Sequence, residues 1–338
     1  LGYLGPNAEL AQKLGVDQPG INPTDLNYYL NYQRAYKTAY EVEQLKAANK
    51  LALTGHNAAR DSFLNGGNEY QIHMAYLEAC GMLEDESPYT NIVALDKNSA
   101  ILHYQYKNKS NGESSQVLLI DAGCRVNGYG SDVTRTSVKE NVNSTFKDLL
   151  QGMVNVELEL VGMVKPGVAY PEIHLAALFK ISQLLIDLDI CDGSAEEIME
   201  KELSHLFMPH GVGHLLGIQV HDVGGHQKDI RGNTRAPPGH SPALRNTREL
   251  SEGMVFTIEP GCYFIPLLLE AERNQERGKS INWNLVDELY PCGGIRVEDN
   301  ILVTHDGAEN LTLSLIHISE PTRRYAIGGA GVWGEKKG

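Results

Sequence analysis

Apolar side chains recur at helical spacing in several long stretches of the chain. The first stretch starts at a capping box formed by Thr38 and Glu41 and ends near Gly66. Three others have the same periodicity, at about 69–80, 144–162 and 172–189. We expect each of these stretches to be a helix that buries one face.

Shorter apolar runs lie between and after these helices, and they are typical of β-strands. They cover residues 91–95, 100–104, 117–120, 254–259 and 294–304. Helices that alternate with strands and hairpins, without an obvious short repeat, predict an α+β fold.

The composition narrows the class of protein. The chain has 338 residues, 42% hydrophobic and 21% charged, as in an ordinary soluble globular protein, and its net charge is -14. This charge repels phosphate backbones and anionic membrane surfaces, so neither nucleic acid nor a membrane is an expected partner. The five cysteines are scattered and form no C-x-x-C pair, which is typical of the reducing cytoplasm.

Three histidines fall within residues 207–222. His210, His214 and His221 are spaced four and then seven apart, with glycines between the first two that disfavour a helix. We therefore expect a loop that leads into a strand. Taken alone, such histidines are more often hydrogen-bonded core residues than metal ligands.

Two aspartates flank a predicted hairpin. Asp121 ends an apolar run, Asp132 follows eleven residues later, and Asn127-Gly128 between them is a strong hairpin signal. If these two residues form the turn, Asp121 faces Thr134 and the aspartates become diagonal neighbours on one face. A longer turn or a bulge would spoil this register, and both carboxylates could also lie on a solvated face.

Two glutamates repeat this pattern of a carboxylate delivered by an apolar strand. Glu259 ends an apolar run just before Pro260, and alternation places Glu298 on the same face as Arg296. A buried carboxylate is costly unless it is paired or bound to a metal. We therefore expect the four carboxylates to share a cation.

Four carboxylates and one imidazole form a mostly hard, oxygen-rich ligand set. It suits Mn²⁺, Co²⁺ or Zn²⁺ better than copper, and the histidine argues against Ca²⁺ and Mg²⁺. Two divalent ions would balance the four carboxylates. Charge balance thus favours two metal ions per chain, and the ligand set leaves Mn²⁺, Co²⁺ and Zn²⁺ open.

Together these residues resemble the Xaa-Pro dipeptidases (prolidases) of the pita-bread metallopeptidase superfamily, in particular the bacterial cytoplasmic branch. The similarity runs from about Tyr36 to Leu313 through the motifs LLIDAG, GSDVTRT, FMPHGVGHLLGIQVHDVGG, MVFTIEPG and GGIRVEDN. It implies a pita-bread (creatinase/aminopeptidase) fold, a mixed curved sheet covered by helices. It also implies a cytoplasmic enzyme that is a homodimer when intact.

The resemblance assigns roles to individual residues. It implies five metal ligands, of which Asp132 and Glu298 bridge the two ions: Asp121, Asp132, His214, Glu259 and Glu298. A metal-bridging hydroxide would attack the carbonyl before proline, and Glu259 would carry the proton to the leaving nitrogen. His210 would lie outside the ligand set, and Arg296 would support the site.

The resemblance also implies the groups that hold the substrate. His221 and His103 would contact the scissile group and the proline carboxylate, and His221 would take part in catalysis. Arg245 would bind the proline carboxylate, a bidentate task suited to a guanidinium. Without the family, a surface arginine and a strand-face histidine would be the better interpretations of Arg245 and His103.

Two alternative functions remain open. An Xaa-Pro aminopeptidase would act on longer peptides, whereas a carboxylate anchor such as Arg245 penalises substrates that continue past proline. A non-catalytic pita-bread scaffold would usually lack part of the ligand set, and here all five positions are filled.

The resemblance divides the chain into three parts. We expect residues 1–35 to be the remnant of a truncated N-terminal domain plus linker, with a helical segment at Ala8 to Leu14. Residues 36–313 would be the catalytic domain. Residues 314–338 break in character and are expected to be a foreign, disordered tail.

Overall fold

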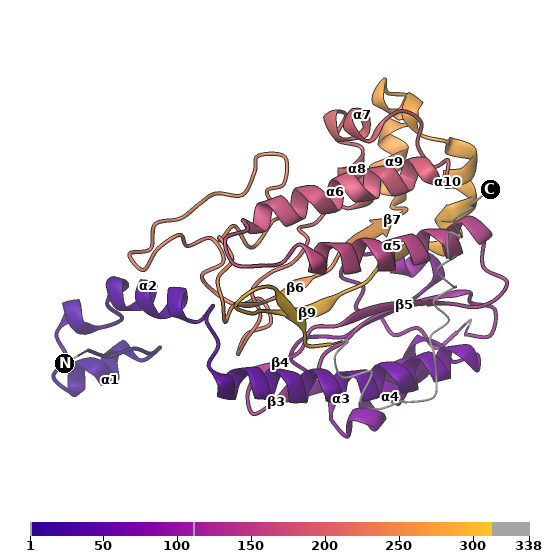
Figure 1. The fold of residues 1–338 in the computed structure, drawn as a ribbon. Coiled ribbons are helices and arrows are strands. Elements are labelled where there is room, and N and C mark those ends of the chain that lie inside the picture. Colours follow the sequence, from indigo (N-terminus) through magenta and orange to yellow (C-terminus); the bar gives the residue numbers. More distant parts are fainter. Residues whose placement is uncertain (1, 111, 313–338) are drawn as a thin grey trace, which may run out of the picture.

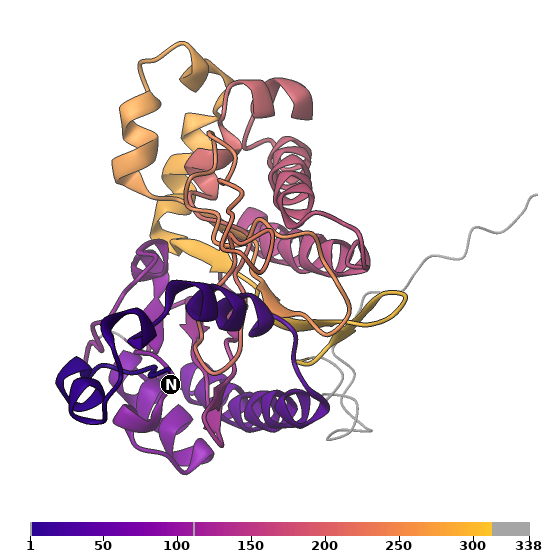
Figure 2. The same cartoon turned by 90° about the vertical axis from the view of Figure 1, so that its left-hand side faces the viewer.

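The computed structural model describes residues 2–110 and 112–312 (Figure 1, Figure 2). Helices lie on both outer sides of a central β-region, and α1 (Ala8–Lys13) and α2 (Thr24–Gln33) lie to one side of this body (Figure 1). The α+β fold is confirmed. The segment 314–338 lies outside the described residues. Among the residues described, no helix is long and apolar enough to cross a membrane.

The first half of the body combines two helices and a small sheet. α3 (Ala39–Leu64) and α4 (Glu69–Cys80) pack against strands β1 (Ile92–Leu95), β2 (Val117–Asp121) and β5 (Thr134–Val138), which pair in the order β1-β2-β5. The predicted capping box starts α3. The apolar faces of both helices and of the sheet form one buried cluster. Burial of this face holds the helices against the sheet.

The second half has a similar plan. α5 (Ser144–Gly162) and α6 (Tyr170–Asp187) cover the sheet of β6 (Val255–Ile258), β9 (Asp299–Val303) and β10 (Ala308–Asn310), which pair in the order β10-β9-β6. The two helices were predicted to within two residues at each end. Their apolar stripes join this sheet in a second buried cluster.

The two sheets meet at a break in the predicted run 294–304. The run is two strands, β8 (Gly294–Arg296) and β9, because Val297 and Glu298 leave the pairing of β8 with β7 (Gly261–Tyr263) and pass to that of β9 with β6. An isolated bridge joins Thr134 of β5 to Glu298 at this break. The bridge brings the ends of both sheets together.

Shorter elements complete the described chain. A hairpin consists of β3 (Arg125–Val126) and β4 (Tyr129–Gly130), and the named strands pair antiparallel throughout. The remaining α-helices are α7 (Ala195–Glu200), α8 (Ser204–Phe207), α9 (Pro266–Leu269) and α10 (Trp283–Leu289). The 3-10 helices are η1 (Gln18–Gly20), η2 (Glu84–Glu86), η3 (Asp96–Ala100), η4 (Glu270–Glu272), η5 (Arg277–Ser280) and η6 (Tyr290–Cys292).

Residues 100–104 do not form the predicted strand. The 3-10 helix η3 is followed by an irregular turn. The buried Glu69 of α4 draws this segment together, because its carboxylate accepts hydrogen bonds from the Leu95 amide, the Asn98 side chain and the Tyr104 hydroxyl. The apolar pattern of this segment does not indicate its contact with a carboxylate that precedes the bonded residues by 26 to 35 positions in sequence.

Helix α2 was not predicted. Its sequence, TDLNYYLNYQ, places Leu26, Tyr29 and Leu30 at helical spacing, but none of the side chains of the helix is buried. The helix lies against the loop that follows His221, where the Gln227 side-chain amide donates to the carbonyl of Tyr28 at 3.2 Å. Tertiary contact, rather than helical periodicity, holds it in place.

Candidate metal centre and substrate pocket

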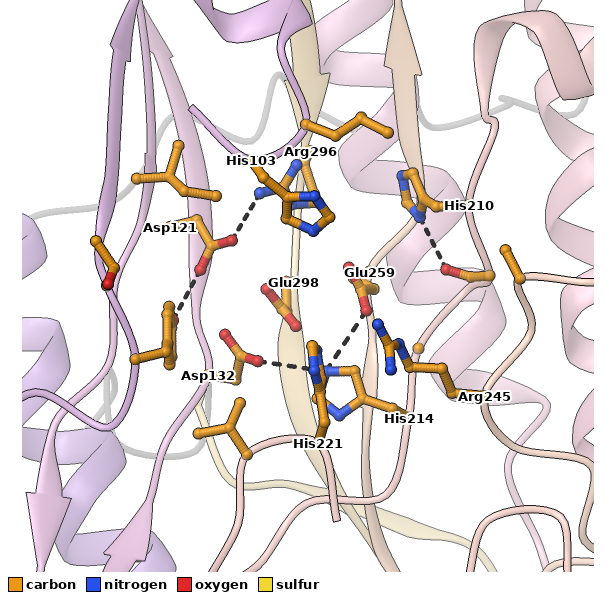
Figure 3. A pocket seen from close by; sticks show the side chains of 18 of the residues that line it. His103, Asp121, Asp132, His210, His214, His221, Arg245, Glu259, Arg296 and Glu298 are labelled. Atoms are coloured by element: carbon orange, nitrogen blue, oxygen red, sulfur yellow. Dashed lines mark hydrogen bonds and ion pairs between the residues drawn. The ribbon is translucent and has the colours of Figure 1, made fainter. Parts of the chain in front are cut away.

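A cavity of about 420 Å³ opens where the two sheets meet (Figure 3). It is lined by all ten side chains to which the sequence assigned a role: His103, Asp121, Asp132, His210, His214, His221, Arg245, Glu259, Arg296 and Glu298. Segments that are far apart in sequence thus converge on one pocket.

Three of these side chains lie close enough to share an ion. Ligand atoms of Asp132, His214 and Glu298 all lie within 4.8 Å of one another, and the three residues are buried. The His214 Nε2 atom is 3.3 Å from an Asp132 carboxylate oxygen and 3.7 Å from one of Glu259. Glu259 therefore stands next to the cluster, with its carboxylate facing the same imidazole (Figure 3).

The hairpin between the two aspartates has the predicted register. Asp121 pairs with Thr134, and the turn residues Asn127 and Gly128 both have positive φ, 49° and 91°, as a type I′ turn requires. The Asp132 amide donates to the Asn300 side-chain oxygen at 3.1 Å, which ties the hairpin to β9. The two aspartates consequently face the pocket from one rigid ribbon.

Asp121 is held from both sides. The Tyr89 hydroxyl donates to one carboxylate oxygen at 2.7 Å, and the Arg296 guanidinium donates to the other at 2.6 Å. Arg296 is itself fixed, because it also donates to the Tyr263 hydroxyl at 2.9 Å. These contacts orient Asp121 and neutralise part of its charge.

The glutamates reach the pocket from strand ends. Glu259 follows β6 directly and precedes Pro260, as the sequence predicts. Glu298 occupies the break between β8 and β9, where the Thr134 hydroxyl donates to its carboxylate at 2.6 Å. Strand geometry therefore sets where both carboxylates point.

Burial and mutual repulsion shift the ionisation of the cluster. Burial, and next the charge of Asp121, raises the pKa of Asp132. Burial, followed by nearby carboxylates, raises the pKa of Glu298 well above its usual value, and burial raises the pKa of Glu259 to about 7. Burial alone lowers the pKa of His214, but hydrogen bonding to Asp132 and the charge of Glu259 raise it overall. The cluster as a whole attracts positive charge.

The donor set fits divalent metal ions. A buried carboxylate is costly unless a cation or a set of hydrogen bonds compensates for its lost hydration. Arg296 compensates for Asp121 in part, whereas Asp132, Glu259 and Glu298 face one another. Carboxylate oxygens with one imidazole nitrogen are ligands that suit Mn²⁺, Co²⁺ or Zn²⁺. These residues could therefore hold such ions.

The two histidines of the PHGVGH stretch differ in their contacts. The His214 Nδ1 atom lies 3.0 Å from the carbonyl of Leu215, to which it donates, and this contact turns Nε2 towards the carboxylates. His210 contacts the Gly211 carbonyl through Nδ1 and the Tyr263 hydroxyl through Nε2. Both nitrogens of His210 thus have protein partners outside the carboxylate cluster.

The remaining predicted residues line the open side of the pocket. The His221 ring lies edge-on to that of His214, with centroids 4.4 Å apart. Burial, followed by the charges of His214 and Arg245, lowers the pKa of His221 to about 4, so this imidazole is neutral at pH 7. Arg245 and His103 come from separate loops and point into the cavity (Figure 3).

Comparison with known proteins now identifies the family. Residues 43–305 match the model of metallopeptidase family M24. The chain belongs to this family. It is 46% identical over 315 residues to the Xaa-Pro dipeptidase of Pseudoalteromonas atlantica, covering 93% of this chain and 71% of the relative. The Xaa-Pro dipeptidase of Shewanella pealeana is 45% identical over 314 residues, covering 93% and 70%. The prolidase resemblance is confirmed, and the chain is an M24 metallopeptidase.

Solved structures of family relatives share the fold. Proline aminopeptidase P II from Yersinia pestis superposes with a TM-score of 0.66 at 27% identity, over 85% of this chain and 59% of that chain. Zinc-substituted Escherichia coli aminopeptidase P in complex with product gives 0.69 at 25% identity, over 91% and 62%. The chain has the pita-bread fold, and it spans less than two thirds of these two structures.

The family implies that the chain uses divalent metal ions and acts on small peptides. The ten residues assigned from the sequence line this pocket, but three residues that hydrogen-bond to them were not assigned: Tyr89, Thr134 and Tyr263. Thr134 lies inside the GSDVTRT motif, where its hydroxyl could have been noticed. Tyr89 stands 32 residues before Asp121 in a segment without a motif, so no sequence signal pointed to it.

Proposed function

We propose that this chain hydrolyses Xaa-Pro dipeptides with two bound divalent metal ions. One observation carries the proposal. Asp132, His214 and Glu298 converge within 4.8 Å in a pocket that also contains the guanidinium of Arg245. A cation site beside a carboxylate-binding group matches a short substrate that ends soon after its scissile bond.

Five residues would hold the ions, with Asp132 and Glu298 shared between the two: Asp121, Asp132, His214, Glu259 and Glu298. We propose Mn²⁺ as the ion, with Co²⁺ or Zn²⁺ as alternatives, since the donors are mostly hard oxygens. Divalent ions supply Lewis-acid polarisation of a scissile carbonyl and make water more acidic. His210 and Arg296 would not bind the ions but would orient their neighbours.

The protein groups then handle the proton and the substrate. Glu259 accepts a proton from the attacking water and returns it to the proline nitrogen as the C–N bond breaks. His221, neutral and next to His214, donates a hydrogen bond to the scissile group. Arg245 binds the proline carboxylate, and His103 contacts the same end of the substrate.

The first experiment compares two peptides on metal-stripped protein supplied with Mn²⁺. We expect cleavage of Leu-Pro and little cleavage of Leu-Pro-Gly, because the tripeptide has no carboxylate where Arg245 would bind it. A preference for Leu-Pro-Gly would move the assignment to an Xaa-Pro aminopeptidase. That alternative has a specific basis, since the solved relatives above are aminopeptidases P.

A substitution at Arg245 tests the carboxylate anchor. For Arg245→Met we expect KM for Leu-Pro to rise roughly 10- to 100-fold, because a hydrogen bond to a charged group contributes about 1.5–3 kcal/mol. The exposed Arg231 of the same region does not line the pocket, so Arg231→Met serves as the control. Equal effects of the two substitutions would contradict the anchor.

We also propose that residues 36–313 form the catalytic unit, and that the protein works in the cytoplasm as a homodimer. All five cysteines are buried free thiols, as a reducing compartment allows. Exposed apolar side chains in α1, directly after it and in α2, among them Leu10, Leu14 and Leu30, offer surface for association. Light scattering on the purified chain would test the dimer, and a mass of one chain would contradict it.

A further inference from the structure

The end of α2 and the segment between α2 and α3 contact the two loops that carry His221 and Arg245. We call Tyr32, Arg34, Tyr36 and Lys37 the linker clamp. One loop contains His221 and the other contains Arg245. Figure 1 shows α2 next to these loops, away from the two helical layers. The linker clamp contacts Asp222, which directly follows His221, and Arg248, which is three residues after Arg245.

Asp222 is the anchor of the first loop. One carboxylate oxygen accepts from Arg34 at 2.5 Å and from the amide of Val223 at 2.9 Å, and the other lies 3.4 Å from the Lys37 ammonium. The side chains of Asp222 and Lys37 are each only 1% exposed. Burial lowers the pKa of Lys37 to about 8, although Asp222 opposes this shift.

The loop is built closely around this ion pair. A Cβ atom at Gly217 would lie 2.5 Å from the Asp222 carboxylate and 3.1 Å from the Lys37 side chain, so a larger residue there would displace the ion pair. The Asp222 amide donates to the Leu215 carbonyl at 2.9 Å, one residue after His214. Asp222 thus ties His221 to both the linker and the segment that carries His214.

Arg248 anchors the second loop. Its guanidinium lies 3.8 Å from the centre of the Tyr32 ring and donates to the Tyr32 carbonyl at 3.1 Å and the Tyr36 hydroxyl at 3.2 Å. Arg248 is 4% exposed, and the two loops also touch directly, because the Thr247 amide donates to the Gly225 carbonyl. The linker therefore holds the two loops as one unit.

We propose that Asp222 is a positioning residue, held by Lys37 and Arg34, that fixes His221 against the metal centre. Arg248, held by Tyr32 and Tyr36, is in the same way a positioning residue for Arg245. This inference rests on the proposed function for the roles of His221 and Arg245. A buried ion pair adds little net stability compared with an apolar pair of the same volume. Its directional contacts instead fix one geometry, which a catalytic imidazole needs.

Two substitutions test the linker clamp. Asp222→Asn keeps the size of the side chain and its bond to Val223 but removes the charge. Arg34→Gln removes a contact whose arginine is 32% exposed, so it tests the inference even if Asp222→Asn does not fold. The matched controls are Glu272→Gln and Arg277→Gln, a pair with the same 2.5 Å contact and 35% arginine exposure that does not line the pocket.

Amide hydrogen exchange measures how well the loops are ordered and does not depend on catalytic activity. In both clamp variants we expect amides of 215–227 and 243–250 to exchange at least about tenfold faster, with α5 and α6 unchanged. In the Mn²⁺-loaded protein, kcat for Leu-Pro should fall about 10- to 100-fold at unchanged metal content. In a His221→Ala background, Asp222→Asn should cause little further loss of kcat, since it acts through His221.

The inference would be overturned by unchanged exchange in these two loops or by equal changes in the control variants. It would also be overturned if Asp222→Asn caused its full loss of kcat in the His221→Ala background. If the unmodified chain cleaves neither peptide, the proposed function fails. The exchange measurement then still decides whether the linker clamp orders the loops.

Discussion

The two sides of the pocket are built in different ways. The carboxylates come from strands and their ends, as Asp121 ends β2, Glu259 follows β6 and Glu298 separates β8 from β9. His103, His221 and Arg245 come from irregular segments. Strand pairing sets the position of a side chain through the backbone ladder, whereas a loop has no such ladder.

Each loop therefore needs its own buried polar anchor. Glu69 gathers the segment that carries His103, and Asp222 holds the loop of His221. Ser241, four residues before Arg245, contacts the Nε2 atoms of His174 and His205 at 2.8 and 3.1 Å. The comparison teaches that the metal side depends on sheet register, while the substrate side depends on charged or hydrogen-bonded groups well away in sequence.

The largest effect is expected on the metal side. Glu298→Gln should lower activity by more than about 1000-fold, because the ions would lose a shared ligand. The metal-free protein should nevertheless become more stable at pH 7, by about 1–2 kcal/mol. The raised pKa of Glu298 means that its ionisation, which is favourable in the unfolded chain, is costly in the fold, whereas glutamine has no such cost and keeps an acceptor for the Thr134 hydroxyl.

Urea unfolding in the presence of a chelator, together with activity after addition of Mn²⁺, checks both halves of this prediction. The exposed Glu252 provides a control, and Glu252→Gln should change neither property. A metal-free Glu298→Gln variant that is less stable than the unmodified chain would show that the carboxylates do not repel one another as described.

A smaller effect is expected at the anchor of the His103 segment. The Glu69 carboxylate also accepts from the Asn108 amide at 2.9 Å, and Glu69→Gln would turn an NH₂ group towards donors. We expect KM for Leu-Pro to rise about tenfold, the effect of roughly 1.4 kcal/mol, with metal content unchanged.

Steady-state kinetics and a metal count on the same preparation make this measurement. Glu86→Gln, at an exposed carboxylate that accepts from the Leu83 amide, is the matched control. Loss of metal together with the rise in KM would mean that the two sides of the pocket are not independent.

The smallest effect concerns acid. Burial, and then the charges of neighbouring histidines, lowers the pKa of His174 to about 3, below the 6.5 expected in the unfolded chain. The unfolded state therefore binds the proton first. This contribution to stability is complete above about pH 6.5 and is lost as pH falls towards 3, by about 1.4 kcal/mol per unit.

His174→Gln should make the pH dependence of unfolding between pH 6 and 5 shallower by about one proton, as measured by urea titrations at several pH values. Identical slopes for the His174→Gln variant and the unmodified chain would show that His174 does not contribute to the pH dependence of stability.

Glu259 has the opposite effect in metal-free protein. Its raised pKa, about 7, means that its contribution to stability is lost as pH rises.

Several parts of the structure could be predicted from local sequence. The Thr38 capping box located the start of α3, and Asn127-Gly128 set the hairpin that pairs Asp121 with Thr134. Caps and turns depend on interactions within a few residues, so the local sequence is enough to predict them. The ten pocket residues followed from family motifs, and the structure places all of them around one cavity.

Other parts could not be predicted because their causes are distant in the chain. Residues 100–104 turn instead of forming a strand, since Glu69 binds donors on both sides of them. Helix α2 has no buried face of its own, and Tyr89 reaches Asp121 across 32 residues. A pattern within one segment contains no information on such partners.

By itself, the sequence determined the α+β class, the main helices, the hairpin register and the identity of the carboxylates and histidines that line the pocket. Only the tertiary structure decided how the substrate-side loops are held and that the Lys37–Asp222 and Tyr32–Arg248 contacts join them to the linker. The physical reason is how far apart in sequence the interacting residues lie. Caps, turns and apolar periodicity act between near neighbours, whereas a buried charge is stable only beside a partner that folding brings from elsewhere in the chain.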